Sequence, residues 1–221
     1  MAYKLSPTSL GLMKECPRCF WLHHNKGIRR PDGIFPSLPS GMDRILKDHF
    51  DYFRDRALMP PELKELGDSV KLFEDNELLD IWRNNKKGLQ FVDLKGNLLR
   101  GAVDNILVKD KTLIVLDYKT RGYELKEDTH LYYQDQLDTY NFLLRRNDYQ
   151  TEDYAYLLFY YPNKVSQNGD VLFHTKLVKM KVDANNAHRV FNNAINLLEG
   201  QMPESSKDCG FCGWVNNCKD I

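Results

Sequence analysis

The sequence predicts an α/β or α+β fold with a mixed central β-sheet flanked by helices. Helical spacing of apolar residues dominates residues 1–88, and two apolar strands joined by a tight turn follow at residues 98–120. A helix, two further strands and a final helix come after them. With 221 residues, the chain suits one domain with a proper core, and we treat residues 1–221 as a single domain.

The bulk composition is that of an ordinary soluble globular protein, with 42% hydrophobic and 28% charged residues. The formal net charge is zero, so any binding of nucleic acid must depend on local basic patches. No apolar run approaches the roughly 20 residues that cross a bilayer. The first ten residues, MAYKLSPTSL, do not resemble a signal peptide. These features predict a cytoplasmic protein that does not enter a membrane.

The N-terminal part, residues 1–88, is predicted to be mainly helical. Ser6 or Thr8 would cap the first helix, and Pro17 would interrupt or kink it. The Gly, Pro and Ser content of the next segment predicts a loop. In order, the predicted segments are a helix over residues 6–26, a loop over 27–41, and helices over 42–58 and 69–86.

The central part, residues 89–200, alternates strands and helices. Asp183 is a candidate N-cap for the last helix and Gly200 its candidate stop. The predicted elements are a strand pair over 98–110 and 111–120, a helix over 129–148, strands over 153–162 and 171–183, and a helix over 184–200. Residues 201–221 form a short cysteine-rich tail.

The strand pair brings two carboxylates together. If Asp110 and Lys111 form a two-residue turn, Asp104 lies directly opposite Asp117, with Cβ atoms about 5 Å apart. Lys119 shares their face because side chains alternate along a strand. Facing carboxylates destabilise a sheet unless a cation lies between them, and carboxylate oxygens suit Mg²⁺ or Mn²⁺. The alternative is a solvated hairpin face, and Asp-Lys is not a favoured two-residue turn.

These residues resemble a known nuclease signature. "GAVDNI" followed by "LDYKT" is similar to the bipartite motif of the PD-(D/E)xK nuclease superfamily, with Asp104, Asp117 and Lys119 at the motif positions. Gln136 and Tyr140 in "QDQLDTYNFLL" fit the Q-x-x-x-Y motif of its RecB-like branch and share one helix face. The resemblance implies a restriction-endonuclease-like core and hydrolysis of phosphodiester bonds.

RecB-like nucleases also carry a metal-binding histidine on an upstream helix. His49 in "SGMDRILKDHF" is the best match, although it lies eight residues after Gly41 where the family often shows four. His23 and His24 are alternatives, and a surface histidine on a charged helix is the other interpretation of His49.

Five cysteines lie near the two ends of the chain. An odd number without an export signal favours metal ligation over disulfides. Thiolates bind Zn²⁺ or hold an iron–sulfur cluster, and their spacing alone does not separate the two. "CPR" together with C-x2-C-x5-C resembles the CRISPR-associated RecB-like nucleases and the nuclease domain of AddB. That resemblance implies a 4Fe–4S cluster held by Cys16, Cys209, Cys212 and Cys218, with Cys19 as a spare or alternative fourth ligand.

The resemblance therefore implies a metal-dependent DNA exonuclease acting on single-stranded ends or overhangs, in CRISPR spacer acquisition or DNA repair, with proteins of those pathways as partners. His49, Asp104 and Asp117, with the Tyr118 carbonyl, would bind Mg²⁺ or Mn²⁺. Lys119 would orient the attacking water or stabilise the transition state, and Gln136 and Tyr140 would position the substrate or Lys119. One alternative is a non-catalytic DNA-binding or scaffold subunit. The other is a nuclease for RNA whose cysteines bind zinc in place of an iron–sulfur cluster.

Overall fold

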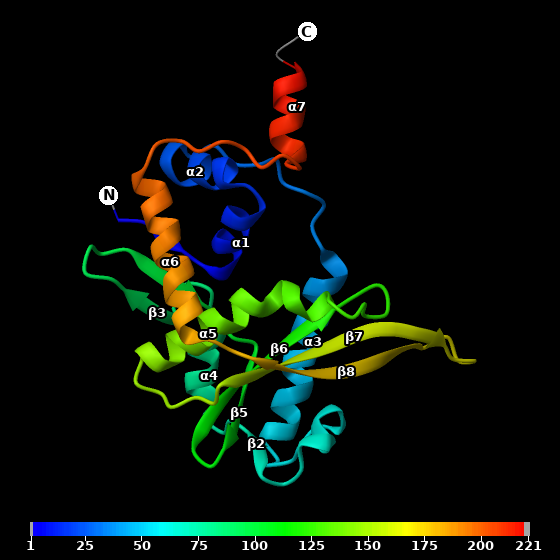
Figure 1. Cartoon of the computed structure of the whole chain (residues 1–221). Helices are drawn as coiled ribbons and strands as arrows, with labels where there is room; N and C mark the ends of the chain where they lie inside the picture. Colours follow the sequence, from blue (N-terminus) through cyan, green and yellow to red (C-terminus); the bar gives the residue numbers. More distant parts are fainter. Residues whose placement is uncertain (1, 219–221) are drawn as a thin grey trace.

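The computed structural model describes residues 2–218 and contains two β-sheets flanked by helices (Figure 1). The larger sheet has the order β2-β5-β6-β7-β8. Its strands are β2 (Val70–Leu72), β5 (Asn105–Lys109), β6 (Thr112–Thr120), β7 (Tyr154–Val165) and β8 (Val171–Lys181). Strands β6 and β7 are parallel and the other neighbours are antiparallel, so the predicted mixed central sheet is confirmed.

The smaller sheet has the order β1-β4-β3. Its strands are β1 (Lys4–Leu5), β4 (Leu98–Gly101) and β3 (Leu89–Val92). The sequence predicted one strand over 98–110, and this was wrong, because residues 102–104 separate β4 in the small sheet from β5 in the large one. The short strands β1 and β3 were not predicted.

Seven α-helices and two 3-10 turns occur in the part of the chain that the structure describes. They are α1 (Pro7–Glu15), α2 (Pro17–Lys26), α3 (Ser37–Arg54), η1 (Pro61–Leu66), α4 (Asn76–Arg83), η2 (Thr129–Tyr133), α5 (Gln134–Arg146), α6 (Ala184–Glu199) and α7 (Gly210–Cys218). None of these helices is both long enough and apolar enough to cross a membrane.

Local sequence signals account for most helix ends. Ser6 caps α1 through a hydrogen bond from the Ser9 backbone N–H, and Pro17 separates α1 from α2 by starting the second helix. Asp183 caps α6 as predicted. The predicted helix over 69–86 was wrong in its first half. Buried Val70 and Leu72 alternate with exposed Lys71 there, a period of two that forms β2.

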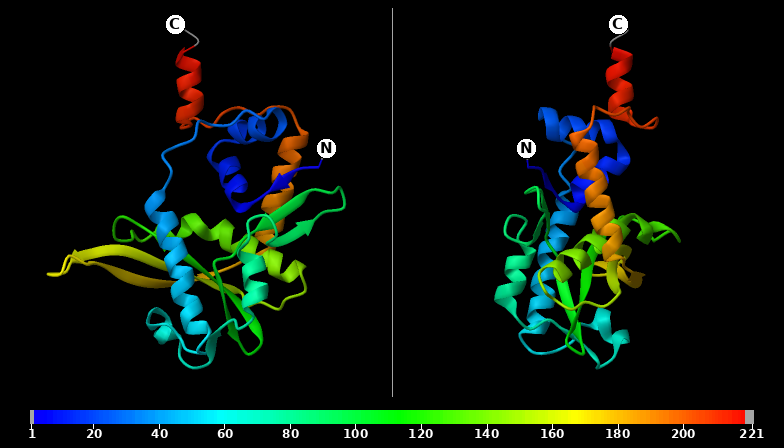
Figure 2. Two further views of the ribbon diagram at one scale, coloured as in Figure 1. Left: turned by 180° about the vertical axis from the view of Figure 1, so that it is seen from behind. Right: turned by 60° about the vertical axis from the view of Figure 1, so that its left-hand side comes forward.

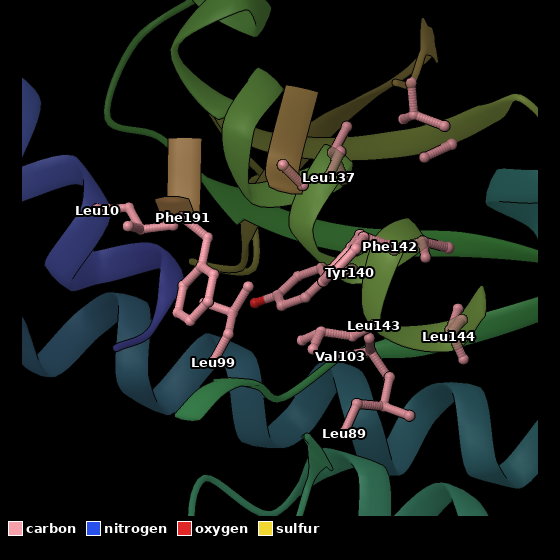
Figure 3. Close-up of a cluster of buried hydrophobic side chains, with 14 of the residues drawn as sticks. Leu10, Leu89, Leu99, Val103, Leu137, Tyr140, Phe142, Leu143, Leu144 and Phe191 are labelled. Carbon is pink, nitrogen blue, oxygen red and sulfur yellow. The ribbon is translucent and has the colours of Figure 1, made fainter. Parts of the chain in front are cut away.

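The two faces of the large sheet carry separate hydrophobic clusters. On one face α3 and η1 cover Ile114, Leu116 and Tyr118 of β6. On the other face the side chains of α1, α5 and α6 pack over Leu113 and Val115. Figure 3 shows part of this second cluster, where the Tyr140 ring lies among leucine and phenylalanine side chains. Because side chains alternate along β6, Asp117 and Lys119 point toward the second face.

Candidate active site

The turn between β5 and β6 sets the alignment of the two carboxylates. Asp110 and Lys111 have φ angles of 46° and 73°, so both turn residues adopt the left-handed conformation of a type I′ turn. Lys109 pairs with Thr112 and Asn105 pairs with Leu116. The predicted register is therefore confirmed, and Asp104 follows as the residue opposite Asp117. Asp-Lys forms this turn although Asn-Gly or Asp-Gly is the usual sequence.

Asp117 is the most enclosed charged group of the site. Its side chain is 1% exposed, compared with 19% for Asp104 and 17% for Lys119. The Lys119 ammonium forms an ion pair with Asp117 Oδ2. Asp104 Oδ2 accepts a 3.1 Å hydrogen bond from the backbone N–H of Tyr118, which holds this carboxylate beside β6.

The electrostatics of Asp117 favour a cation. Burial raises the pKa of Asp117 to about 7, with the Lys119 charge opposing and the Asp104 charge adding to the shift. Burial lowers the pKa of Lys119, but the charges of Asp117 and Asp104 outweigh it, so the net shift is upward. Among residues 2–218, Asp117 Oδ2 has no well-directed hydrogen bond despite its contact with the ammonium. A buried oxygen with spare lone pairs fits a divalent metal ligand.

A second lysine enters the site from α3. Lys47 Nζ lies 3.4 Å from Asp104 Oδ1 and 2.8 Å from Asp43 Oδ2, so its ammonium bridges two carboxylates. The Lys47 charge also lowers the pKa of Asp117. The sequence analysis missed Lys47 and Asp43. The available signal was their spacing of four residues on a predicted helix, which places both side chains on one face.

The structure pairs His49 with Glu62. His49 Nε2 lies 3.1 Å from Glu62 Oε1, and the same oxygen accepts a 3.2 Å hydrogen bond from the Tyr160 hydroxyl. Within residues 2–218, His49 does not form a close group of metal-binding atoms with Asp104 and Asp117. The reason is helical geometry: His49 lies two residues after Lys47, about 200° around the helix axis.

The alternative histidines also lie elsewhere. His23 and His24 are on α2, with ring centroids 4.7 Å apart, and the His24 ring meets the edge of Phe20. Burial, with a smaller contribution from the His23 charge, lowers the pKa of His24 to about 4. His24 is therefore uncharged at neutral pH.

The motif residues of α5 support the site from the side of the second cluster. Gln136 Nε2 donates a 2.8 Å hydrogen bond to the Tyr140 hydroxyl. Burial and the charges of Asp117 and Asp104 raise the pKa of Tyr140 well above 10, so Tyr140 remains a neutral phenol. In η2, just before α5, the Tyr133 ring covers the Lys119 ammonium at 4.8 Å from the ring centroid.

Two arginines, the buried Arg54 and the largely buried Arg83, support the chain at Asp104 and Asn105. Arg83 Nε donates a 2.9 Å hydrogen bond to the Asp104 carbonyl oxygen, while its other nitrogens bind both oxygens of Asp51 at 2.8 and 2.9 Å. Arg54 also pairs with Asp51 and donates to Asn105 Oδ1. The sequence analysis did not identify this network, because its members come from α3, α4 and the hairpin.

Four cysteines from the N-terminal and C-terminal parts of the chain meet in the structure. The sulfur atoms of Cys16, Cys19, Cys209 and Cys212 all lie within 4.8 Å of one another. The predicted set contained Cys218 in place of Cys19. The structure puts Cys218 at the exposed end of α7, outside the group.

The pKa values of the crowded thiols shift in different directions. Burial raises the pKa of Cys16, but hydrogen bonds from the backbones of Cys19 and Ser206 outweigh it and bring the pKa to about 6. Burial and the neighbouring thiols raise the pKa of Cys212 to about 12. Without a cation nearby, the four thiols cannot all ionise. Such a group is a typical ligand set for a metal ion, because the ion neutralises the combined charge of the thiolates.

Comparisons with known proteins identify the family of this chain. A search of curated proteins found no match. A solved structure described as the crystal structure of SSO0001 is similar over 89% of this chain and 77% of that chain, with 16% identity and a TM-score of 0.45. The model of the PD-(D/E)XK nuclease superfamily matches residues 4–219, which is nearly the whole chain. This chain therefore belongs to the PD-(D/E)XK nuclease superfamily, whose nucleases use divalent metals.

Proposed function

We propose that this protein is a divalent-metal-dependent deoxyribonuclease whose active site lies at Asp104, Asp117 and Lys119. The observation that carries the proposal is the fully buried Asp117 carboxylate, which lies across the hairpin from Asp104 and shares its face with Lys119. A solvated hairpin would leave these groups exposed. Burying two carboxylates together destabilises the fold, and such an arrangement is typical of functional sites.

Asp104 and Asp117 would hold the Mg²⁺ or Mn²⁺ ion, which supplies a more acidic bound water and stabilises charge on the phosphate. Lys119 lies beside Asp117, where its ammonium can orient the attacking water or neutralise the developing charge. The raised pKa keeps Lys119 protonated at neutral pH. Gln136 and Tyr140 act as positioning residues on the α5 side of the site.

We assign the contribution of α3 to Lys47. Its ammonium is 3.4 Å from Asp104, whereas His49 is engaged by Glu62. Two lysines on one site can each contact a non-bridging oxygen of a phosphodiester, which stabilises the charge that builds up during hydrolysis. Asp43 holds Lys47 in place through its 2.8 Å ion pair.

The finer substrate assignment follows from the family resemblance. We propose exonuclease action on single-stranded ends or overhangs, with CRISPR spacer acquisition or DNA repair as the pathway. The chain carries no net charge. Substrate binding would therefore depend on the local lysines of the site and on other basic patches.

Cleavage assays test the proposal. End-labelled single-stranded DNA, duplex DNA and single-stranded RNA are incubated with wild-type protein and Mn²⁺, Mg²⁺ or no added divalent metal. We expect metal-dependent cleavage of DNA, with a product ladder that gives the polarity. Lys119→Ala should remove this activity, whereas Lys164→Ala, at an exposed position on β7, should retain it.

Other outcomes would change the assignment. Preferential cutting of RNA would support a ribonuclease on the same residues. A folded wild-type protein that binds DNA without cutting it in any metal would contradict the proposal and indicate a binding or scaffold subunit. Equal residual cleavage by Lys119→Ala and wild type would show a contaminating nuclease or a different site.

A further inference from the structure

We propose that Cys16, Cys19, Cys209 and Cys212 form a site for a single tetrahedral thiophilic ion, Zn²⁺ by chemical class, and that the 4Fe–4S cluster expected from the resemblance does not fit this chain. The inference is independent of the chemistry at Asp104 and Asp117. It depends on the distances between the sulfurs, on the position of Cys218 and on the charge beside the site.

The sulfur spacing is that of one metal ion. A tetrahedral Zn²⁺ site with Zn–S bonds of about 2.3 Å places its sulfurs about 3.8 Å apart. The observed separations are 3.9 Å between Cys16 and Cys212 and 3.6 Å from Cys19 to both Cys209 and Cys212. In a 4Fe–4S cluster each thiolate binds a different iron at a separate corner of the cube, so the four sulfurs must lie much farther apart. The cube has no room between these sulfurs.

The ligands form two matched Cys-x2-Cys pairs. One pair, Cys16 and Cys19, flanks the start of α2, and the other, Cys209 and Cys212, flanks the start of α7. This pairing of short loops is typical of structural zinc sites with four cysteines. Figures 1 and 2 show α2 and the start of α7 at the same end of the molecule.

Cys218 cannot join the group without unwinding α7. It follows Cys212 by six helical positions, which at about 1.5 Å per residue is about 9 Å along the helix axis. Its side chain is exposed, whereas Cys16, Cys19 and Cys209 are buried. The C-x2-C-x5-C spacing that suggested an iron–sulfur cluster therefore contributes only its first two cysteines.

Arg30 supplies charge compensation beside the sulfurs. Four thiolates around one divalent cation carry a net charge of −2. Arg30 Nη2 donates a 3.7 Å hydrogen bond to Cys209 Sγ, and Arg30 Nη1 pairs with Glu15 at 2.5 Å. The Arg30 guanidinium also lies over the Phe211 ring, 4.7 Å from its centroid. Such outer contacts orient the ligands and increase metal affinity, typically by 10–100-fold.

Metal analysis of the purified full-length protein is the decisive experiment. Protein produced in medium containing both iron and zinc is purified anaerobically, and zinc, iron and acid-labile sulfide are measured. We expect one zinc per chain, no labile sulfide and no brown colour. Cobalt substitution should give the visible absorption of tetrahedral cobalt with four thiolates. Stoichiometric iron and sulfide in a brown wild-type protein would overturn the proposal.

Cys19 and Cys218, the two candidates for the fourth ligand, provide matched variants. Cys218→Ser should keep one zinc per chain, because its side chain is exposed and away from the group. Cys19→Ser should lose most of the zinc or weaken its binding by at least tenfold. If Cys19→Ser does not fold, Cys218→Ser still decides, because a loss of metal from this variant would show that Cys218 is a ligand. Arg30→Gln should bind zinc about tenfold more weakly, with Arg29→Gln as its control.

Discussion

The hairpin site and the cysteine site both bring negatively charged groups close together, but they do so in different ways. At the hairpin, Asp104 and Asp117 lie thirteen residues apart in the sequence and are compensated by the ammonium groups of Lys47 and Lys119. At the cysteine site, residues more than 190 positions apart enclose one another. In our proposal, the first arrangement would leave a metal exchangeable and open to substrate. The second would surround a metal with four thiolates, which suits a structural role.

Breaking the cysteine site should produce the largest effect on stability. The proposed metal would join the two ends of the chain, so its loss would free a very long loop, and Cys19→Ser should lower the free energy of unfolding by about 4–5 kcal/mol. The melting temperature should fall by roughly 10 °C or more. Thermal and urea unfolding would measure this, with Cys218→Ser as the control. Equal stability of the two variants would show that the cysteine group binds no stabilising metal.

Breaking the hairpin site should remove activity while leaving the fold intact. Asp117→Asn removes the proposed metal ligand and the ion-pair partner of Lys119, so cleavage should fall by about 10³-fold, or roughly 4 kcal/mol in the transition state. Single-turnover cleavage at saturating Mn²⁺ measures this loss. The control is Asp110→Asn, a change in the turn outside the site. Cleavage by Asp117→Asn at near wild-type rate would place the active site elsewhere.

The same carboxylate should make the stability of the metal-free site depend on pH. The folded pKa of Asp117, about 7, lies above its ordinary value of 3.8, so the folded state binds the proton more tightly. This contribution to stability is complete below about pH 4 and is lost as the pH rises through 7. Urea unfolding without added Mg²⁺ or Mn²⁺ should show this loss between about pH 4 and 7, and Asp117→Asn should lack it. Mg²⁺ or Mn²⁺ binding should strengthen over the same range, as the metal displaces the proton.

The two α3 residues allow a sharper test of the hairpin site. Lys47→Met removes the ammonium beside Asp104, and we expect a 10–100-fold loss of cleavage. His49→Gln keeps a polar group beside Glu62 and should change cleavage by no more than a fewfold. Both rates are measured at several Mn²⁺ concentrations, which separates metal binding from the chemical step. A larger loss of cleavage in His49→Gln than in Lys47→Met would show that His49, and not Lys47, is the α3 residue that contributes to cleavage.

Sequence reasoning found the parts of the site that depend on local pattern. The alternation of β6 and the length of its turn were enough to align Asp104 with Asp117, because register follows directly from those two features. The spacing of Gln136 and Tyr140 likewise predicted a shared helix face, and the two side chains are hydrogen-bonded.

The missed parts depend on how distant elements pack. The sequence pattern favoured His49 and did not point to Lys47, whose place in the site depends on the side on which α3 packs against Tyr118. Similarly, the choice between Cys19 and Cys218 depends on the helical conformation of α7, which carries Cys218 away from the other sulfurs. The arginine brace at Asp104 joins three elements, so no short motif could reveal it.

The smallest expected effect concerns the aromatic cover of Lys119. The Tyr133 ring lies 4.8 Å from the ammonium and stabilises its charged form by about 0.5–1 kcal/mol. Tyr133→Leu should therefore reduce cleavage two- to fivefold and move the alkaline limb of the pH–rate profile to lower pH, because Lys119 would lose its proton more easily. Tyr133→Phe keeps the ring and should behave like the wild type. If Tyr133→Phe and Tyr133→Leu lose activity equally, the hydroxyl is the important group and Tyr133 contacts the substrate directly.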